Sequence, residues 1–465
     1  MRSNIKFNRQ FLLVDYLILI VNLTFCCLYL ILSLNNRISH DDFYSMYIVE
    51  EFGVLNGVKL IYNQWCTRYM ALIISFLVTY LLKCKLSLFI YQIFLFFFGT
   101  YSIFFFLKSI CENLKYPFFK IKLINYSLLL LGGMFYCSFN IGETWFWLSS
   151  SCTYLLSLIV LIFSVGLIIN VNKSLIHFFF LALCGFHIGG SNGTLSLIIL
   201  FSVCFITILQ AFYKYRLSKN FIYSNLIKKI IVFNLFVQIA FLLLYLGKGN
   251  EIRSSYFKDI SIMNAIVLNL KFSAILLLKL VLKVLPFSFI FSIAFSNFLQ
   301  ERTIKINTKY LMNNIFISSL LLVLFIYIFQ LPITYKTQDI GANRTIYPIS
   351  LATFLTCIYV IYLLFSVLQK QQLINLISVL SLLILISFNS YQIYNQYSIT
   401  SNYSKSFDKR IIDINKQKKS TIIYIKPLPK PGYLHSAEIS KDTAHFTHRQ
   451  IKLGLKLKSE IRFSD

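Results

Sequence analysis

The feature that most constrains this chain is a series of twelve apolar segments. Together they make up most of its length. A membrane-spanning helix needs about 20 apolar residues, and most of the segments approach or exceed that length. The stretches between them are short, except for residues 34–65 and 247–270. The segments are 11–33, 66–82, 86–107, 123–139, 150–170, 175–189, 194–212, 230–246, 275–298, 312–332, 346–367 and 374–393. This pattern predicts an all-α polytopic membrane protein.

The composition excludes the two classes that a basic chain usually suggests. Of the 465 residues, 57% are hydrophobic and 13% are charged, whereas a soluble domain averages about 25% charged residues. The formal net charge of +27 comes largely from Lys and Arg between apolar segments, where such residues orient a membrane protein. Nucleic-acid-binding proteins instead carry them on a polar surface. We therefore expect neither an ordinary soluble enzyme nor a nucleic-acid-binding protein.

The basic loops predict how the chain crosses the membrane. Lys and Arg gather before the first segment and in loops 108–122, 213–229 and 299–311, which places these parts on the cytoplasmic side. That assignment requires segment 66–82 to be re-entrant or interfacial, which leaves about eleven spanning helices. The N-terminus is then cytoplasmic, and the C-terminus lies outside. We expect a transmembrane domain over residues 1–395 and a small soluble region over 396–465, with a strand near 420–426.

The first outer loop, residues 34–65, carries an unusual acidic pair. Only 17 of the 465 residues are acidic, yet Asp41 and Asp42 are adjacent. One of them can act as a general base on a hydroxyl group, or the pair can hold a divalent cation such as Mg²⁺ or Mn²⁺. They can also simply stabilise the start of a helix. The residues that follow, 43–60, have the spacing of an amphipathic helix on a membrane surface.

Arginines mark the same outer face. Arg68 follows Trp65 at the start of an apolar segment, and Arg253 and Arg344 each follow a glycine and an asparagine, with Asn250 in the first of these loops. Arginine binds phosphate through its planar fork of N–H donors. The alternatives are a side chain that snorkels to the interface, for Arg68, and an ion pair or a solvated charge for the other two.

Loop 140–149 combines aromatic side chains with a lone acid. Glu143, Trp145 and Trp147 match a carbohydrate-binding surface, because the C–H faces of sugars pack on aromatic rings. A membrane-interface aromatic belt is the alternative. A glycine-rich break at residues 189–193 favours a tight turn over a phosphate-binding loop. The cysteines form no CxxC pair, and we interpret them as small apolar residues.

Taken in order, these motifs resemble the GT-C superfamily of integral-membrane glycosyltransferases, and most closely its bacterial multipass members of unassigned substrate. The resemblance covers about residues 1–370. It differs at Gly193, where such proteins often have an acid. The matching residues are Asp41, Asp42, Trp65, Arg68, Glu143, Phe146, Trp147, Tyr154, Gly249, Asn250, Arg253 and Arg344.

The resemblance implies transfer of a sugar from a polyprenyl-phosphate donor to a glycan, lipid or protein acceptor. Asp41 or Asp42 would deprotonate or orient the acceptor hydroxyl, with Glu143 as a further acid of the site. The donor phosphate would contact Arg68, Asn250, Arg253 and Arg344, and the sugar or lipid would contact Trp65, Trp145, Trp147 and Tyr347. The resemblance does not decide whether the acidic pair also holds a divalent cation. The implied location is the periplasmic face of a bacterial cytoplasmic membrane, in the synthesis of cell-envelope glycans.

Two other functions share these features. A transporter or flippase for lipid-linked sugars is the first, although such proteins often show internal repeats and charges at the membrane midplane, and we find neither in the sequence. A polymerase or ligase of lipid-linked saccharides is the second. It would use the same outer face and the same lipid phosphate, but not the acidic pair as its base.

Overall fold

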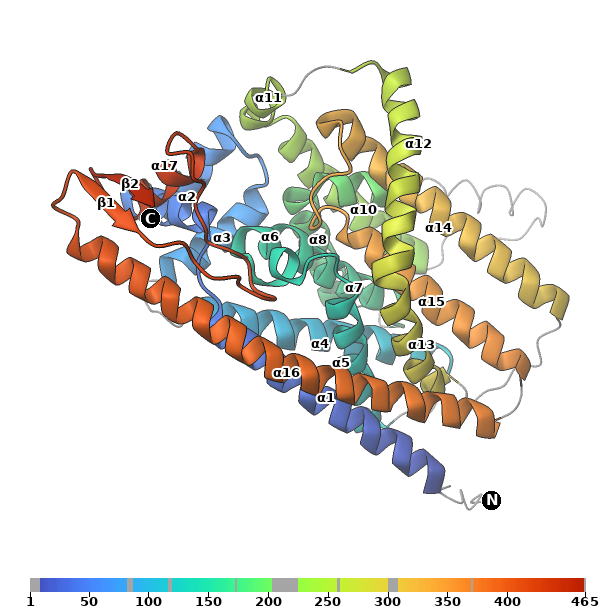
Figure 1. The fold of residues 1–465 in the computed structure, drawn as a ribbon. Coiled ribbons are helices and arrows are strands. Elements are labelled where there is room, and N and C mark those ends of the chain that lie inside the picture. The colour runs from blue at the N-terminus through green and yellow to red at the C-terminus, as the bar shows by residue number, and fades with distance from the viewer. Residues whose placement is uncertain are drawn as a thin grey trace. The chain divides into compact units, whose positions relative to one another are not determined.

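In the computed structural model the chain is mostly helical (Figure 1). The structure describes residues 9–81, 87–115, 119–171, 174–202, 225–256, 260–299, 308–368 and 371–463. Helices occur at all twelve predicted apolar segments, although 194–212 is described only as far as Ser202. Within the described residues, eight helices are long and apolar enough to cross a membrane. This is consistent with an all-α membrane protein, whereas the expected count of about eleven spans stays a prediction.

The chain divides into two compact units. Unit 1 comprises Met1–Ile31, Pro117–Phe139 and Ile260–Asn395. It contains most of α1 (Arg9–Asn35), α5 (Lys120–Tyr136), α12 (Ile262–Lys279), the π-helical turn η3 (Leu280–Val284), α13 (Leu285–Leu299), α14 (Thr308–Thr337), α15 (Tyr347–Leu368) and the first part of α16 (Gln371–Lys416).

Unit 2 comprises Leu32–Tyr116, Asn140–Asp259 and Gln396–Asp465. Its elements are α2 (His40–Gln64), α3 (Tyr69–Leu81), α4 (Ser87–Asn113), the π-helical turn η1 (Gly142–Phe146), α6 (Leu148–Ser150), the π-helical turn η2 (Ser151–Leu155), α7 (Leu156–Ile169), α8 (Leu175–Ser191), a short helix (Gly193–Ser202), α10 (Asn225–Tyr245), α11 (Lys248–Ser254), β1 (Ile422–Ile425), α17 (Phe446–Gly454) and β2 (Glu460–Phe463), together with the end of α16.

Polar side chains join helices inside unit 1. The Tyr136 hydroxyl donates to Asn389 Oδ1 at 2.7 Å, and Asn389 Nδ2 donates to Thr24 Oγ1 at 3.0 Å. These bonds connect α5, α16 and α1. Because lipid offers no hydrogen-bonding partners, buried polar groups in a membrane protein pair with one another.

The glycines of the predicted break at 189–193 serve helix packing instead. Helix α8 continues to Ser191, and only Asn192 interrupts the path into the next helix. A Cβ atom on Gly189 would lie 2.3 Å from the carbonyl oxygen of Val237 on α10, and one on Gly190 would lie 2.6 Å from the Tyr69 ring on α3. The predicted break therefore narrows to a one-residue connection at Asn192, and the glycines before it let helices approach closely.

Two helices extend beyond their predicted apolar segments. Helix α12 begins at Ile262, inside the stretch 247–270 that we expected to be a loop, and that stretch also contains α11. Helix α16 runs without a break to Lys416, although the apolar pattern ends near residue 393. No Gly or Pro occurs between Gln371 and Lys416, so nothing in the local sequence stops the helix where it becomes polar.

Helix α2 folds back on itself at Gly53. This residue has φ +73° and ψ 176°, a left-handed conformation that glycine adopts without strain. A Cβ atom on Gly57 would lie 2.8 Å from Ile48 Cγ2, whereas nine residues of straight helix would separate these positions by about 13 Å. Ile48 and Ile61 belong to one buried cluster with Phe76 of α3. The predicted amphipathic helix is thus a helical hairpin packed on α3.

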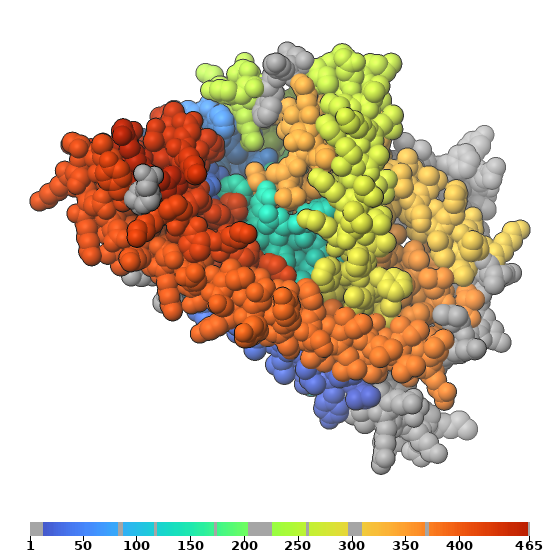
Figure 2. All heavy atoms as spheres, in the orientation of Figure 1, coloured from blue at the N-terminus to red at the C-terminus, as the bar shows by residue number. Residues whose placement is uncertain are grey.

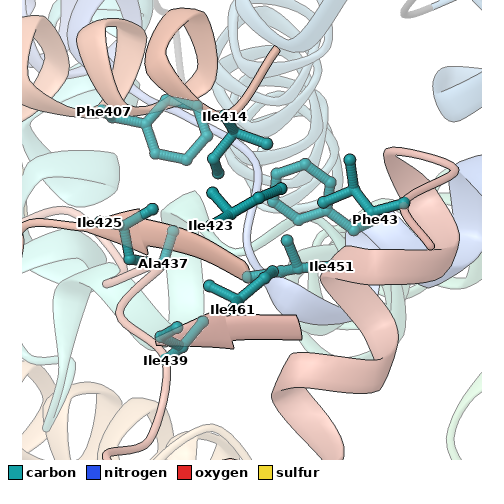
Figure 3. Packing of buried hydrophobic residues seen from close by; sticks show 10 residues of the cluster. Phe43, Phe407, Ile414, Ile423, Ile425, Ala437, Ile439, Ile451 and Ile461 are labelled. Carbon is teal, nitrogen blue, oxygen red and sulfur yellow. The ribbon is translucent and has the colours of Figure 1, made fainter. Parts of the chain in front are cut away.

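The C-terminal segment, residues 396–465, builds a small core together with the start of α2. Side chains from the end of α16, β1, α17 and β2 converge on Phe43 (Figure 3). Strand β1 confirms the predicted strand at 420–426, and it pairs in parallel with β2. The segment's atoms, red in Figure 2, are at the surface of the face that is drawn.

The close approach of the two arms of α2 gives a stability prediction. Gly57→Val places methyl groups where Ile48 and the Phe76 ring already lie, so we expect unfolding to become easier by about 1–3 kcal/mol. Asn56→Val is the matched control because Asn56 is exposed on the same arm. Thermal unfolding in detergent, followed by intrinsic fluorescence, measures both. Equal midpoints for the two variants would contradict the packed hairpin.

Candidate functional site

The acidic pair lies at the start of α2, and Asp42 is almost completely buried there. The backbone N–H of Ser39 donates to Asp42 Oδ2 at 2.7 Å, so the carboxylate stabilises the first turn of the helix. The side chain is 1% exposed. Among the described residues, no hydrogen bond to its other oxygen, Oδ1, meets ordinary geometric limits, although the backbone N–H of Ser149 lies beside the carboxylate. The helix-start interpretation is therefore correct for one oxygen of Asp42 and leaves the other to be explained.

Burial changes the acidity of this end of α2. It raises the pKa of Asp42 from 3.8 to about 7, an effect that Asp41 reinforces and the backbone N–H groups of Ser39 and Ser149 partly oppose. Burial also lowers the pKa of His40, as does His445, whereas Asp41 and Glu438 act in the opposite direction. A carboxyl group with a pKa near 7 changes its charge within the physiological range.

Asp41 is held by the C-terminal segment. Gln450 of α17 donates from Nε2 to Asp41 Oδ1 at 2.9 Å. Within the described residues, neither Asp41 nor Asp42 forms an ion pair. The acidic pair therefore has neutral hydrogen-bond donors as its partners.

The two tryptophans of loop 140–149 have different surroundings. This stretch is mostly helical, with η1 and α6, and Trp145 is fully buried at 0% exposure. Trp145 is therefore part of the core, which corrects the expectation that it would contact sugar. Trp147 is partly exposed and stacks on the imidazole of His435, with ring centroids 4.4 Å apart and 8° between the planes. The segment with His435 passes so close that a Cβ atom on Gly142 would meet the Leu434 carbonyl at 2.4 Å.

Buried polar atoms without partners gather around Asp42. Asn36 and Phe146 are joined by a hydrogen bond of 2.9 Å, and Ser149 lies beside Asp42, so residues 36–42 and 144–150 are neighbours. Within the described part of the chain, the buried atoms without a hydrogen-bond partner in these two stretches and at Gln450 include Asn36 Oδ1, Ser39 Oγ, His40 Nδ1, Asp42 Oδ1, Thr144 Oγ1, Ser150 Oγ and Gln450 Oε1. Since nearly all buried polar groups in native proteins are hydrogen-bonded, such a concentration calls for an explanation.

Arg68 reaches the same helical stretch as Asp42. Its guanidinium carbon is 5.3 Å from the centroid of the Tyr154 ring, whereas Asp42 lies beside Ser149. Five residues of helix separate Ser149 and Tyr154, which corresponds to about 7.5 Å along the axis. The structure therefore brings one predicted phosphate-binding arginine to the same short helical stretch as the acidic pair.

A second arginine lies against Trp65 at the other end of α2. The Arg253 guanidinium carbon is 5.9 Å from the centroid of the Trp65 ring, and the Tyr256 ring contacts the same indole at 5.7 Å. Helix α11 is held there because Gly249 packs on the backbone of Tyr62 and Trp65. Asn250 follows in the first turn of α11. Trp65 is 49% exposed, so this cluster is open to a ligand.

The remaining predicted residues differ in their positions. Glu143 lies in η1 and is 8% exposed, and its backbone N–H donates to Asn140 Oδ1 at 3.0 Å. Arg344 is partly exposed in the turn before α15. Tyr347 is fully buried, and its hydroxyl donates to the Met134 carbonyl at 2.9 Å. Tyr347 is therefore a core residue, which corrects the expected ligand contact. Arg344 and Tyr347 belong to unit 1, and the other predicted residues to unit 2.

Among the described residues, no group of three or more His, Cys, Asp or Glu side chains is arranged to hold a metal ion. Asp41 and Asp42 would be the carboxylate ligands of a Mg²⁺ or Mn²⁺ ion, and water and substrate phosphate would have to supply the other ligands. The steps proposed below use protein groups only.

Three residues of the site were missed by the sequence analysis. His40 directly precedes the acidic pair, and that position was a usable signal. His435 and Gln450 come from the C-terminal segment, and no motif in the sequence connects them with residues 41–42. The packing of α17 against α2 brings Gln450 to the site, and the loop that contains His435 lies against Gly142 and Trp147.

Comparisons of the chain with protein-family models, with curated proteins and with solved structures gave no match.

The raised pKa of Asp42 predicts how stability depends on pH. Between pH 3.8 and about 7 the folded state binds the Asp42 proton more tightly than the unfolded state does. Stability from this group is thus present at low pH and is lost as the pH rises towards 7, by about 4 kcal/mol in total. Asn at position 42 does not titrate, so Asp42→Asn should gain stability relative to wild type over this range. Melting temperatures from pH 4 to 8 test this, and parallel curves would contradict it.

Proposed function

We propose that this protein is a membrane glycosyltransferase that moves a sugar from a polyprenyl-phosphate donor to an acceptor hydroxyl on the outer face of a bacterial cytoplasmic membrane. The observation that carries the proposal is the concentration of unpartnered buried polar atoms around Asp42. A sugar is rich in hydroxyl groups, which both donate and accept hydrogen bonds. Such a ligand matches a site where buried acceptors and a titrating carboxyl group lie together.

Asp42 or Asp41 acts as the general base in this proposal. A base works best when its pKa is close to the operating pH, and the pKa of Asp42 is raised to about 7 by burial. Asp42 Oδ1, the buried oxygen that does not accept from Ser39, is the atom that would take the proton from the acceptor hydroxyl. Asp41, held by Gln450, would orient that hydroxyl or serve as the base itself.

The arginines stabilise the leaving phosphate. As the sugar–oxygen bond breaks, negative charge grows on the polyprenyl phosphate, and cationic donors fixed in place lower the energy of that state. Arg68 and Arg253 are fixed against the rings of Tyr154 and Trp65. Asn250 and Arg344 are further candidates from the sequence. The apolar helices around the site suit a donor whose long lipid chain stays in the bilayer.

The second candidate function is a transporter for lipid-linked sugars, which would bind the same ligand. A transporter needs a site for the lipid phosphate but does not need a base. Transfer of sugar with release of free polyprenyl phosphate distinguishes the two functions, because a transporter leaves the glycosyl–phosphate bond intact.

Loss of the base gives the central prediction. Asp41→Asn and Asp42→Asn keep an oxygen that accepts the hydrogen bonds from Gln450 and Ser39, but they remove the basic carboxylate. We expect the variant without the true base to lose at least 100-fold in the rate of sugar transfer. The measurement is release of polyprenyl phosphate from radiolabelled polyprenyl-phosphate hexoses by the purified protein with membrane-extract acceptors.

The matched control is Asp408→Asn. Asp408 is an exposed aspartate of α16 that pairs with Arg37 at 2.8 Å, so its loss removes the same charge far from the acidic pair in sequence. This variant should transfer sugar at the wild-type rate. Full activity in both acidic-pair variants and in the double variant would rule out the proposed base.

The pH profile of transfer follows from the same carboxyl group. Only the ionised form of Asp42 accepts a proton, so the rate should rise with pH and level off above its pKa of about 7. If Asp42 is the base, the Asp42→Asn variant's residual rate should lose this rise, whereas that of Asp408→Asn should keep it. Rates measured from pH 5 to 9 under saturating donor provide the test, and a profile flat across pH 6–8 in wild type would exclude Asp42 as the base.

A further inference from the structure

The C-terminal segment reaches the candidate site at one amide side chain. We infer that Gln450 is a positioning and specificity-determining residue, which holds Asp41 through its N–H group and offers its amide oxygen to a hydroxyl of the bound sugar. This inference rests on the proposed function and deepens it. It assigns the last 70 residues of the chain a role in recognition as well as in folding.

The hydrogen bond to Asp41 fixes how the amide is turned. A carboxylate without a proton only accepts hydrogen bonds, so the group at 2.9 Å from Asp41 Oδ1 is the amide nitrogen of Gln450. The amide oxygen therefore points to a different partner. That oxygen is buried and has no hydrogen-bond partner among the protein groups. A buried carbonyl oxygen left without a donor is costly, which favours a ligand that supplies one.

Helix α17 holds Gln450 rigidly on both sides. The next residue, Ile451, is buried in the C-terminal core with Phe43 and Ile461. Four residues on, Gly454 approaches α2 so closely that a Cβ atom would lie 2.4 Å from the Phe43 carbonyl oxygen. At the other end, His445 caps the helix by accepting from the Thr447 N–H. A side chain fixed in this way selects among ligands by geometry, because it cannot adapt.

The chemistry of an amide suits this position. A lysine or arginine beside Asp41 would lower the pKa of the acidic pair and weaken it as a base. Gln450 instead orients Asp41 without adding charge. A hydroxyl group that donates to Gln450 Oε1 would lie next to the acidic pair, where the proposed proton transfer takes place. Gln450 would thus recognise one hydroxyl group, either of the sugar or of the acceptor.

The test compares Gln450→Met with the matched control Gln417→Met. Methionine has nearly the shape of glutamine and removes both the N–H donor and the amide oxygen. Gln417 belongs to the same segment but binds the backbone of Tyr424, away from the acidic pair in sequence. Binding of polyprenyl-phosphate hexoses, and of their monodeoxy analogues, is followed by intrinsic tryptophan fluorescence, since Trp147 belongs to the site.

We expect Gln450→Met to weaken binding of the best hexose at least fivefold, and Gln417→Met to leave it unchanged. One monodeoxy analogue should bind wild type at least fivefold more weakly than the parent hexose does. The same analogue and the parent hexose should bind Gln450→Met equally well. A merely structural role would weaken parent and analogues equally. This non-additivity is the signature of a direct contact.

Four outcomes overturn the inference. Equal weakening of all hexoses by Gln450→Met makes Gln450 structural. Unchanged binding removes it from the site. If Gln450→Met fails to fold, the binding of the monodeoxy analogues to wild type still decides. If none of them binds more weakly than its parent hexose, the site does not recognise a hydroxyl group. Binding with no transfer would refute the proposed function alone, and absence of binding by wild type would refute both.

Discussion

The candidate site depends on how one carboxyl group is buried. Asp42 lies in the first turn of α2 and is 1% exposed, and the backbone N–H of Ser39 satisfies one of its oxygens. Burying a carboxylate with few partners is costly, and the raised pKa expresses that cost. The proposed role as a base would use this raised pKa.

The fold keeps that carboxyl group in place through parts of the chain that are far apart in sequence. The hairpin of α2 turns at Gly53 and packs on α3, which also begins just after Arg68. The C-terminal core closes on Phe43, the residue next to Asp42. Because Phe43 anchors this core, any movement of α17 would move the acidic pair too. The proposed roles of Gln450 and Asp42 would thus be mechanically linked.

Sequence reasoning was reliable where a physical pattern repeats over many residues. Hydrophobic length located all twelve helical segments, and the short apolar run TIIYI at residues 421–425 located β1. It was less reliable for single residues, because burial is decided by tertiary packing. Trp145 and Tyr347 both had the residue type of a ligand contact, but their surroundings buried them completely. His435 and Gln450 had no sequence signal, since neighbours as far apart as Asp41 and Gln450, 409 positions along the chain, become visible only when the chain folds.

The distribution of charge around the candidate site suits the proposed sugar transfer. In the described part of the chain, the acidic pair has no ion pair, whereas other acids do, such as Glu438 with Arg410 at 2.9 Å. Arg68 and Arg253 lie against aromatic rings. Pairing an arginine with Asp42 would lower the pKa of the acid and neutralise the cation. Keeping them on separate partners preserves both a base with a pKa near 7 and cations for a phosphate, which are the two groups that displacement of a lipid phosphate by a hydroxyl requires.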